Sequence, residues 1–187
     1  MKLNYGALYP GLIVGASGSI LDPVSCLIRG TEAGVAHAFD PAVASHVFCV
    51  CKEHDLLYGM SMDLEGLSED DLNTWEHGNF GDHVVWVANP GVVWDNYALQ
   101  DKINQWLLKS HAIGIKYDVL ELFRWWGINT PDDPKKLVCS DFTRIMLQTF
   151  GLAHPKEWDA DFKMSDPWDQ QIYFTNANKL LPNWRAE

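Results

Sequence analysis

The sequence predicts an α+β domain, because short runs of β-branched and aromatic residues are interspersed with longer stretches of helical periodicity. Residues 45–51 have the clearest strand pattern, and residues 95–111 have a clear helical one. The chain contains no internal repeat, low-complexity segment or linker. With 187 residues, 47% of them apolar, it is long enough to bury a core. We therefore expect residues 1–187 to form a single domain.

Four short segments are predicted to be strands. Residues 12–14 are apolar and lie between turn residues, and residues 45–51 carry a run of mostly apolar side chains. A turn at residues 54–55 connects that run to a second predicted strand over residues 56–64, so the two strands should form a hairpin. Residues 83–88 form the last predicted strand, which an Asn-Pro-Gly sequence closes.

Helical patterns occur in both halves of the chain. Residues 95–111 place apolar side chains at helical spacing, and Gly114 is expected to break that helix. Residues 117–126 are expected to form a second helix. The sequence Ser-Glu-Asp-Asp at residues 68–71 is typical of a capped helix start. Residues 25–44 have no clear pattern.

The segment 135–151 is predicted to be a loop that leads into a helix at Cys139. Ser140 and Asp141 suit a first helical turn, and Gly151 suits the position just past the helix end. The side chains at helical spacing that form its apolar face are Phe142, Ile145, Met146 and Phe150. Because the peptide dipoles of a helix favour an anion at its N-terminus, they favour a thiolate at Cys139, which is therefore a candidate nucleophile.

The charge balance excludes several classes of partner. The chain has 14 Lys and Arg against 25 Asp and Glu, a net charge of 14 − 25 = −11. No basic run exists to neutralise phosphates, so we expect no nucleic acid as a partner and no attraction to an anionic membrane surface. No stretch reaches the ~18 apolar residues of a membrane span. The N-terminal segment lacks a signal-peptide pattern, so we expect a cytoplasmic protein or one released without a signal peptide.

The cysteines do not have the pattern of a disulfide framework or of a metal site. They occupy positions 26, 49, 51 and 139. In a chain of 187 residues this set is unlike that of a small secreted domain. A zinc site of His46, Cys49, Cys51 and His54 is disfavoured, because strand alternation places the two His on one face and the two Cys on the other. We expect no metal and no cofactor.

A catalytic cysteine needs a histidine that accepts its proton and a third polar group that orients this histidine. The seven His residues of the chain are His37, His46, His54, His77, His83, His111 and His154. His46 and His83 stand out because each lies at the start of a predicted strand, where a side chain is held rigidly. Spacing alone does not choose between the two.

Three motifs occur in the order seen in a known family. Ser45-His46-Val47 opens a strand, Tyr117-Asp118-Val119-Leu120-Glu121-Leu122 follows far downstream, and Val138-Cys139-Ser140-Asp141 opens a helix. This order resembles the circularly permuted NlpC/P60 papain-like enzymes of the YiiX/YebB-like group, which are related in layout to the lecithin:retinol acyltransferase family. Residues 11–14, 28–31 and 164–169 resemble other segments of that group, so the resemblance spans residues 10–175.

The resemblance implies a papain-like fold, in which helices pack against a small antiparallel sheet that carries His46 while Cys139 begins a helix. It also implies roles for three side chains. Cys139 is the expected nucleophile and His46 the expected base. Tyr117 maps onto a family Tyr that lies near the nucleophile and positions the substrate or stabilises the oxyanion. The backbone N–H of Cys139 would supply one oxyanion donor.

The third member of the catalytic triad departs from the family pattern. The family commonly has a Glu early in the second hairpin strand, and Ser61 stands at that position here. Ser61, Asp63 and Glu65 share one strand face, because side chains alternate along a strand. We expect Asp63 to orient His46, with Ser61 or Glu65 as the alternatives. A serine can accept a hydrogen bond from imidazole, but it carries no charge to stabilise the imidazolium.

The family most readily implies hydrolysis of an amide bond, in a peptide or a cell-wall peptide, through a thioester on Cys139. The same Cys-His machinery also suits an acyltransferase or a lipid-ester hydrolase that acts on an acyl-linked small substrate, because groove walls and loops set the substrate. A catalytically silent binding or structural protein with this fold is the third alternative. Residues 68–111 exceed what the minimal fold needs, and we expect them to form an inserted subdomain or a cover of the cleft.

Overall fold

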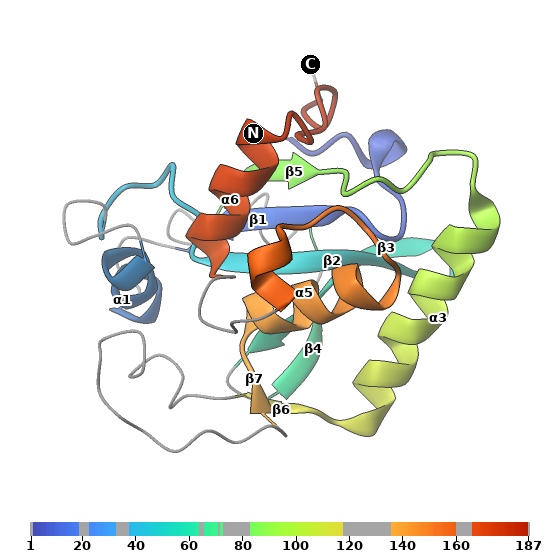
Figure 1. Ribbon diagram of the computed structural model, residues 1–187, viewed down its shortest axis with the longest axis horizontal. Coiled ribbons are helices and arrows are strands. Elements are labelled where there is room, and N and C mark those ends of the chain that lie inside the picture. Colours follow the sequence, from blue (N-terminus) through green and yellow to red (C-terminus); the bar gives the residue numbers. More distant parts are fainter. Residues whose placement is uncertain are drawn as a thin grey trace.

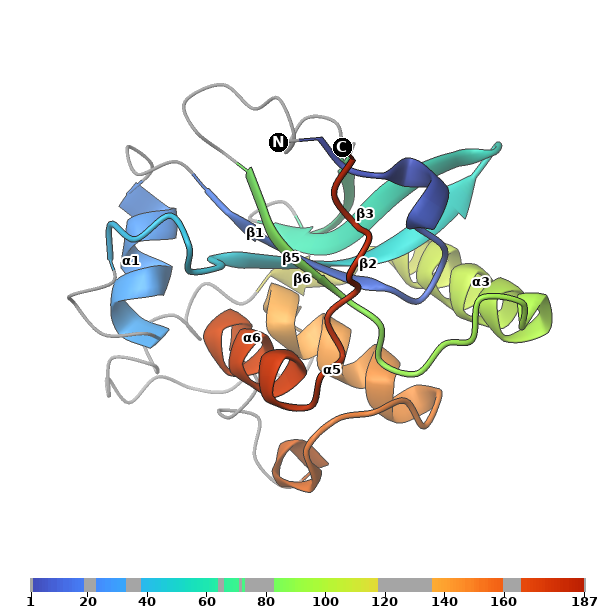
Figure 2. The same ribbon diagram turned by 90° about the horizontal axis from the view of Figure 1, so that it is seen from above.

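A five-stranded antiparallel sheet, in the order β4-β3-β2-β1-β5, forms the centre of the protein (Figure 1). The computed structural model describes residues 2–18, 23–32, 38–63, 66–70, 72, 83–117, 136–159 and 166–186. Helices α5 and α6 cover one face of the sheet, as both ribbon views show (Figures 1 and 2). The predicted α+β class and the small antiparallel sheet packed against helices are confirmed.

The elements follow one another along the chain in this order: η1 (Tyr5–Ala7), β1 (Ile13–Ser17), α1 (Pro23–Glu32), β2 (His46–Glu53), β3 (Leu56–Asp63), β4 (Gly66–Asp70), β5 (His83–Ala88), α3 (Tyr97–Ile113), β6 (Lys116–Tyr117), β7 (Lys136–Leu137), α5 (Cys139–Thr149), η4 (Lys156–Asp159) and α6 (Pro167–Asn176). The two chain ends lie together, because Leu3 forms a bridge with Arg185 (Figure 2). No helix among the described residues combines the length and the apolar character that a membrane crossing requires.

Strand β1 lies between β2 and β5 and is buried along its whole length. Its position requires a glycine at residue 15, because a Cβ there would overlap the indole of Trp86 on β5. Trp86 is 3% exposed and packs against Phe174 of α6, with ring centroids 5.8 Å apart. The contact between the bare backbone at Gly15 and this indole therefore helps to fix α6 on the sheet.

The predicted hairpin is confirmed. Strands β2 and β3 pair in antiparallel register, with Cys49 opposite Met60. Their two-residue turn has His54 at φ 47° and Asp55 at φ 65°, both in the left-handed region. Asp and His adopt this region more readily than most residues, and two positive φ angles match the twist of a tight hairpin.

Residues 68–70, which were predicted to begin a helix, instead belong to strand β4 (Gly66–Asp70) at one edge of the sheet, and Leu72 is helical. Ser68 pairs with Ser61 of β3, so hydrogen bonds to a neighbouring strand override the local capping pattern. Strand β5 forms the opposite edge and matches the prediction for residues 83–88. The segment 68–111 thus contributes to both edges of the sheet, and an insertion boundary within it stays a prediction.

The helix predicted over residues 95–111 is confirmed as α3, and Gly114 ends it as expected. Helix α3 begins after Asn96, whose side chain accepts a hydrogen bond from the Leu99 N–H, and ends at Gly114 with φ 71°.

The helix predicted over residues 117–126 is wrong at its first residue, because Tyr117 ends β6 and pairs in parallel with Leu137 of β7. Residues 118–126 lie outside the described part of the chain.

Helix α1 occupies part of the segment 25–44, which had no clear sequence pattern, and a fully buried arginine ties it to β1. The Arg29 guanidinium donates hydrogen bonds to Ser17 Oγ at 2.9 Å and to the carbonyls of Gly18 and Ala38 at 2.8 and 2.9 Å. These bonds offset the desolvation of a buried charge, because a buried cation is tolerated only when its donors are satisfied.

The substitution Gly15→Ala should lower the free energy of unfolding by about 2 kcal/mol or more, because the buried Trp86 ring must shift to admit a methyl group. Without that contact, alanine would be better than glycine in a strand. Urea unfolding measures the change. The control is Gly6→Ala, whose new Cβ would meet only Asn4 Oδ1 at 3.4 Å. A stability equal to wild type in Gly15→Ala would contradict the packing described for β1.

The substitution Asp166→Asn should raise stability at pH 8 by about 2 kcal/mol. Asp166 caps α6 by accepting from the Asp169 N–H, and burial, followed by the Asp169 charge, raises its pKa from 3.8 to about 7. Because the folded pKa is above the ordinary value, the stabilising effect of protonation is complete below pH 3.8 and is lost as the pH rises through 7. Asparagine keeps the capping oxygen without the charge.

The gain from Asp166→Asn should therefore vanish near pH 4, where the native side chain is already neutral. Thermal unfolding of both proteins across this range measures the difference. The control is Asp95→Asn, since Asp95 is an exposed carboxylate outside α6. An equal gain for Asp166→Asn at pH 4 and pH 8 would show that the charge of Asp166 is not the cause.

Candidate functional site

Cys139 is the first residue of α5, as predicted, and its side chain is 1% exposed. The preceding residue, Val138, is extended, with φ −99° and ψ 170°. Strand β7 ends at Leu137 and is held by its pairing with β6, so the chain enters the helix from a fixed position. Thr143 Oγ1 donates a hydrogen bond of 3.1 Å to the carbonyl of Cys139, one helical turn earlier in α5.

Helix α5 packs on β2 and β3, and a polar contact in its first turns fixes its position on the sheet. The Cys49 thiol of β2 lies 3.6 Å from Thr143 Oγ1. From the other side, Gln170 of α6 donates a 3.0 Å hydrogen bond from Nε2 to the Ser140 carbonyl. The N-terminus of α5 is therefore held between the sheet and α6, and Cys139 is positioned with it.

The charges in the first turn of α5 are compensated. Asp141 lies 3.7 Å from Arg144, and both side chains are almost fully buried. A carboxylate two residues after Cys139 would disfavour a second negative charge there, and the guanidinium offsets this effect. The helix dipole remains as a favourable contribution to a thiolate at this position.

His46 is the first residue of β2, and burial dominates its electrostatics. Desolvation lowers the imidazole pKa from 6.5 to about 4, and the negative charge of Asp63 opposes part of that shift. The ring packs edge-on against Phe48, with centroids 4.7 Å apart. At neutral pH the imidazole is uncharged, which is the form that a general base requires.

Of the three expected orienting residues, Asp63 acts electrostatically on His46. It is the last residue of β3, and its Oδ1 accepts a 3.2 Å hydrogen bond from the Gly66 N–H. Ser61 is fully buried, and its hydroxyl donates to the Val47 carbonyl. Glu65 lies outside the described residues. The structure thus brings His46 and Asp63 together at the end of the sheet where β2 begins and β3 ends.

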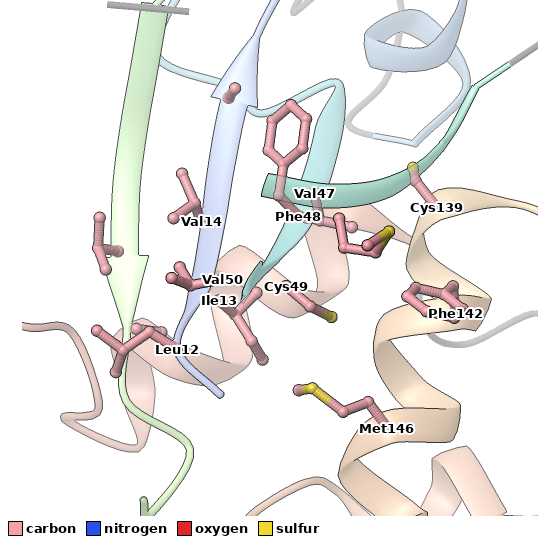
Figure 3. Close-up of a cluster of buried hydrophobic side chains, with 14 of the residues drawn as sticks. Leu12, Ile13, Val14, Val47, Phe48, Cys49, Val50, Cys139, Phe142 and Met146 are labelled. Atoms are coloured by element: carbon pink, nitrogen blue, oxygen red, sulfur yellow. The ribbon is translucent and has the colours of Figure 1, made fainter. Parts of the chain in front are cut away.

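The two faces of β2 impose a constraint on the Cys139–His46 pair. Cys49 points toward α5, whereas Phe48 leaves the strand in the opposite direction (Figure 3). His46 contacts Phe48, and strand alternation places both on the face away from Cys49. The imidazole can therefore meet the Cys139 thiol only around the end of the strand. Helix α5 runs in the same direction as β2, so both elements begin at that end (Figures 1 and 2).

The competing base, His83, lies at the start of β5, on the other side of β1 from β2. Its Nε2 is 2.7 Å from the Pro41 carbonyl, so this nitrogen is committed to a structural hydrogen bond. Helix α5 packs against β2 and β3. The fold therefore places His46, rather than His83, on a strand that α5 contacts.

Two of the other cysteines, Cys49 and Cys51, are held in the thiol form by burial. All four cysteines are free of disulfides. Burial raises the pKa of both Cys49 and Cys51 to about 12, which keeps them protonated and inert. Within the described ranges, no group of three or more His, Cys, Asp or Glu side chains could hold a metal ion.

The sequence did not indicate two residues that support the candidate site. Gln170 is fully buried and bonds to the Ser140 carbonyl, and Phe48 forms the wall against which the His46 ring rests. Phe48 could have been anticipated from its alternation with His46, but nothing in the local pattern indicates Gln170. Tyr117 lies in β6 opposite Leu137, so its backbone is close to the start of α5.

No protein-family model matches the chain, and a search of the curated proteins finds no match to its sequence. The assignment to a family therefore stays a prediction. The structure itself shows an α+β architecture in which His46 begins β2, Asp63 ends β3 and Cys139 begins α5.

The substitution Asp63→Asn should lower the imidazole pKa of His46 below about 4, because it removes the negative charge that raises it. Titration of the histidine ring signals by NMR measures the value. Asp55→Asn is the matched control, since Asp55 lies in the hairpin turn at the far end of β2. An unchanged His46 pKa in Asp63→Asn would contradict the electrostatic pairing of His46 with Asp63.

Proposed function

We propose that this protein is a thiol-dependent hydrolase of the circularly permuted NlpC/P60 papain-like type, with Cys139 as the nucleophile and His46 as the base. The observation that carries the proposal is the placement of Cys139 at the start of α5, at the end of the sheet where His46 begins β2 and Asp63 ends β3. A helix N-terminus favours a thiolate, and a neutral, partly buried imidazole is ready to accept a proton.

The proposed reaction proceeds through a thioester. The His46 imidazole accepts the proton of the Cys139 thiol, and the sulfur bonds to the carbonyl carbon of an amide. The negative charge that develops on the carbonyl oxygen is stabilised by the backbone N–H of Cys139. The tetrahedral intermediate collapses by breaking the C–N bond, and the imidazolium gives its proton to the leaving amine. Water, deprotonated by His46, then attacks the thioester, releases the acid and restores the thiol.

The remaining residues have supporting roles in this proposal. Asp63 stabilises the imidazolium by its negative charge. In the folded protein this charge already offsets part of the lowering of the His46 pKa that burial causes. Tyr117 lies on β6, which pairs with the strand that leads into α5, and it positions the substrate or contributes to oxyanion stabilisation. The substrate is an amide in a peptide or a cell-wall peptide, and the same site could pass the acyl group to an alcohol or amine instead of water. The net charge of −11 disfavours a strongly anionic substrate.

A catalytically silent binding or structural protein is the second candidate function, and two observations favour it. Cys139 is 1% exposed, so substrate could reach its sulfur only after a local opening. In addition, the position at which the family has a Glu is occupied by Ser61, whose hydroxyl bonds to the Val47 carbonyl. The two candidates differ in whether Cys139 reacts selectively.

Cys139 should react selectively with a thiol-directed acyl probe, and Cys139→Ala should abolish this labelling and all turnover. His46→Gln should slow the reaction by about 100-fold or more, because it removes the base. His83→Gln is the matched control and should leave the rate unchanged, since His83 is bound to Pro41. Mass spectrometry of digested protein locates the modified residue.

The labelling rate of Cys139 should be constant near neutral pH and fall as the pH approaches about 4, where His46 becomes protonated. Cys49 and Cys51 should remain unmodified, because their pKa values are about 12. Equally slow labelling of all cysteines, or an unchanged rate in His46→Gln, would rule out the hydrolase and favour the silent scaffold.

A further inference from the structure

A pocket lies at the opposite end of β2 from the candidate catalytic site. It has a volume of about 390 Å³ and lies between the loop after η1, the β2–β3 hairpin and the first turns of α3. Lys52 of β2 contributes to its wall. Lys52 is six residues beyond His46 along an extended strand, a separation of about 20 Å. The pocket is therefore independent of Cys139 and His46.

Aromatic rings from three segments form one side of this pocket. Tyr9, which is 6% exposed, and Trp94 meet edge to face, with centroids 5.0 Å apart and planes at 77°, so the two rings form an aromatic corner in which Trp94 presents the exposed face. Tyr97 is also part of the lining. Trp94 is 53% exposed and Tyr97 is 68% exposed, which is unusual for side chains of this size. Such a set of ring faces is suited to a ligand that packs against π-systems.

The aromatic corner is held in place before any ligand binds. The Tyr9 hydroxyl donates to the Val92 carbonyl at 3.0 Å and accepts from Asn89 Nδ2 at 2.9 Å. Gln100, which is 7% exposed, donates from Nε2 to the carbonyls of Val93 and Trp94 at 3.1 and 2.7 Å. A buried side chain thus fixes the loop that presents the Trp94 ring, so little ordering entropy is lost on binding.

The amide groups in the lining are already engaged within the protein. Asn104 Oδ1 accepts from the Lys52 N–H at 2.6 Å, and Asn104 Nδ2 donates to the Lys52 carbonyl at 2.7 Å. The Gln100 amide nitrogen is bound to the two loop carbonyls. A sugar needs several such donors and acceptors for its hydroxyl groups. Besides apolar side chains and Lys52, the pocket presents aromatic rings and two carboxylates, of which Asp55 pairs with Lys52 and Asp101 accepts a 2.9 Å hydrogen bond from Gln105.

The charge of the lining favours a cation. Asp55 and Asp101 carry two negative charges against the single positive charge of Lys52, which lies 2.8 Å from Asp55. The N-terminus of α3 contributes only a partial positive charge. The whole chain, at −11, adds a long-range attraction for cations.

We propose that the pocket formed by Tyr9, Trp94, Tyr97 and Asp101 binds an organic ammonium ion, such as the trimethylammonium group of a choline-type ligand. The methyl groups pack against the exposed rings of Trp94 and Tyr97, and the positive charge interacts with these ring faces and with the aspartates. Aromatic faces combined with nearby carboxylates recognise quaternary ammonium groups in this way, because the face of an aromatic ring carries partial negative charge.

The test uses NMR titration of the full chain with choline and with 3,3-dimethylbutan-1-ol, its neutral isostere. Choline should shift the indole signal of Trp94 in a saturable manner, and the isostere should bind about fivefold more weakly or worse. Trp94→Ala should weaken choline binding by about tenfold. Lys52→Gln should strengthen it by about twofold, because it removes a competing cation.

Val93→Ala is the matched control, since Val93 is exposed next to Trp94 and its side chain does not line the pocket. Cys139→Ala should bind choline as wild type does, which separates this proposal from the hydrolase mechanism. Equal binding of choline and the isostere would show an apolar pocket without cation recognition. Saturable binding of glucose or N-acetylglucosamine without choline binding, or no saturable binding of choline, would also overturn the proposal.

Discussion

The packing of α5 across β2 and β3 is the constraint on which the candidate site depends. Thr143 meets Cys49 in this interface, and Gln170 of α6 holds the Ser140 carbonyl from the opposite side. A helix held at two points near its first turn cannot slide along the sheet without breaking buried hydrogen bonds, which are costly to leave unmade. The location of Cys139 is therefore a consequence of tertiary contacts made by its neighbours.

Burial has opposite consequences for the groups around this helix. It keeps His46 neutral, with a pKa of about 4, and it keeps the Cys49 thiol protonated, with a pKa of about 12. The neutral imidazole also couples stability to pH. Its folded pKa is below 6.5, so the unfolded chain binds the proton first, and stability is lost as the pH falls from 6.5 toward 4. The effect has an upper limit of about 3 kcal/mol.

The two ends of β2 differ in character. At its start, His46 is enclosed between the strand and its neighbours, with the Asp63 carboxylate as its electrostatic partner. Near its other end, Lys52 borders an open pocket in which the side chains of Trp94 and Tyr97 are more than half exposed. A single strand therefore connects the partly buried His46, the proposed base, with the open pocket that we propose as a cation site. Neither site needs the other to form, because their hydrogen bonds involve different residues.

Local sequence determined the features that depend on neighbouring residues alone. The start of α5 at Cys139, the hairpin turn at His54 and Asp55, and the end of α3 at Gly114 follow from backbone preferences and periodicity. Residues 68–71 satisfy a capping pattern locally and therefore predict a helix start, whereas the pairing of Gly66–Asp70 with β3 is decided by a neighbouring strand.

Only the tertiary structure decided which histidine lies on a strand beneath α5, and that Asp63 is the carboxylate that acts on it. It also decided that Gln170 and Gly15 support the sheet and its helices. The physical reason is the same for each of these residues. Their partners are distant in sequence, so the energy of the contact depends on where the chain returns, and a local pattern carries no record of that position.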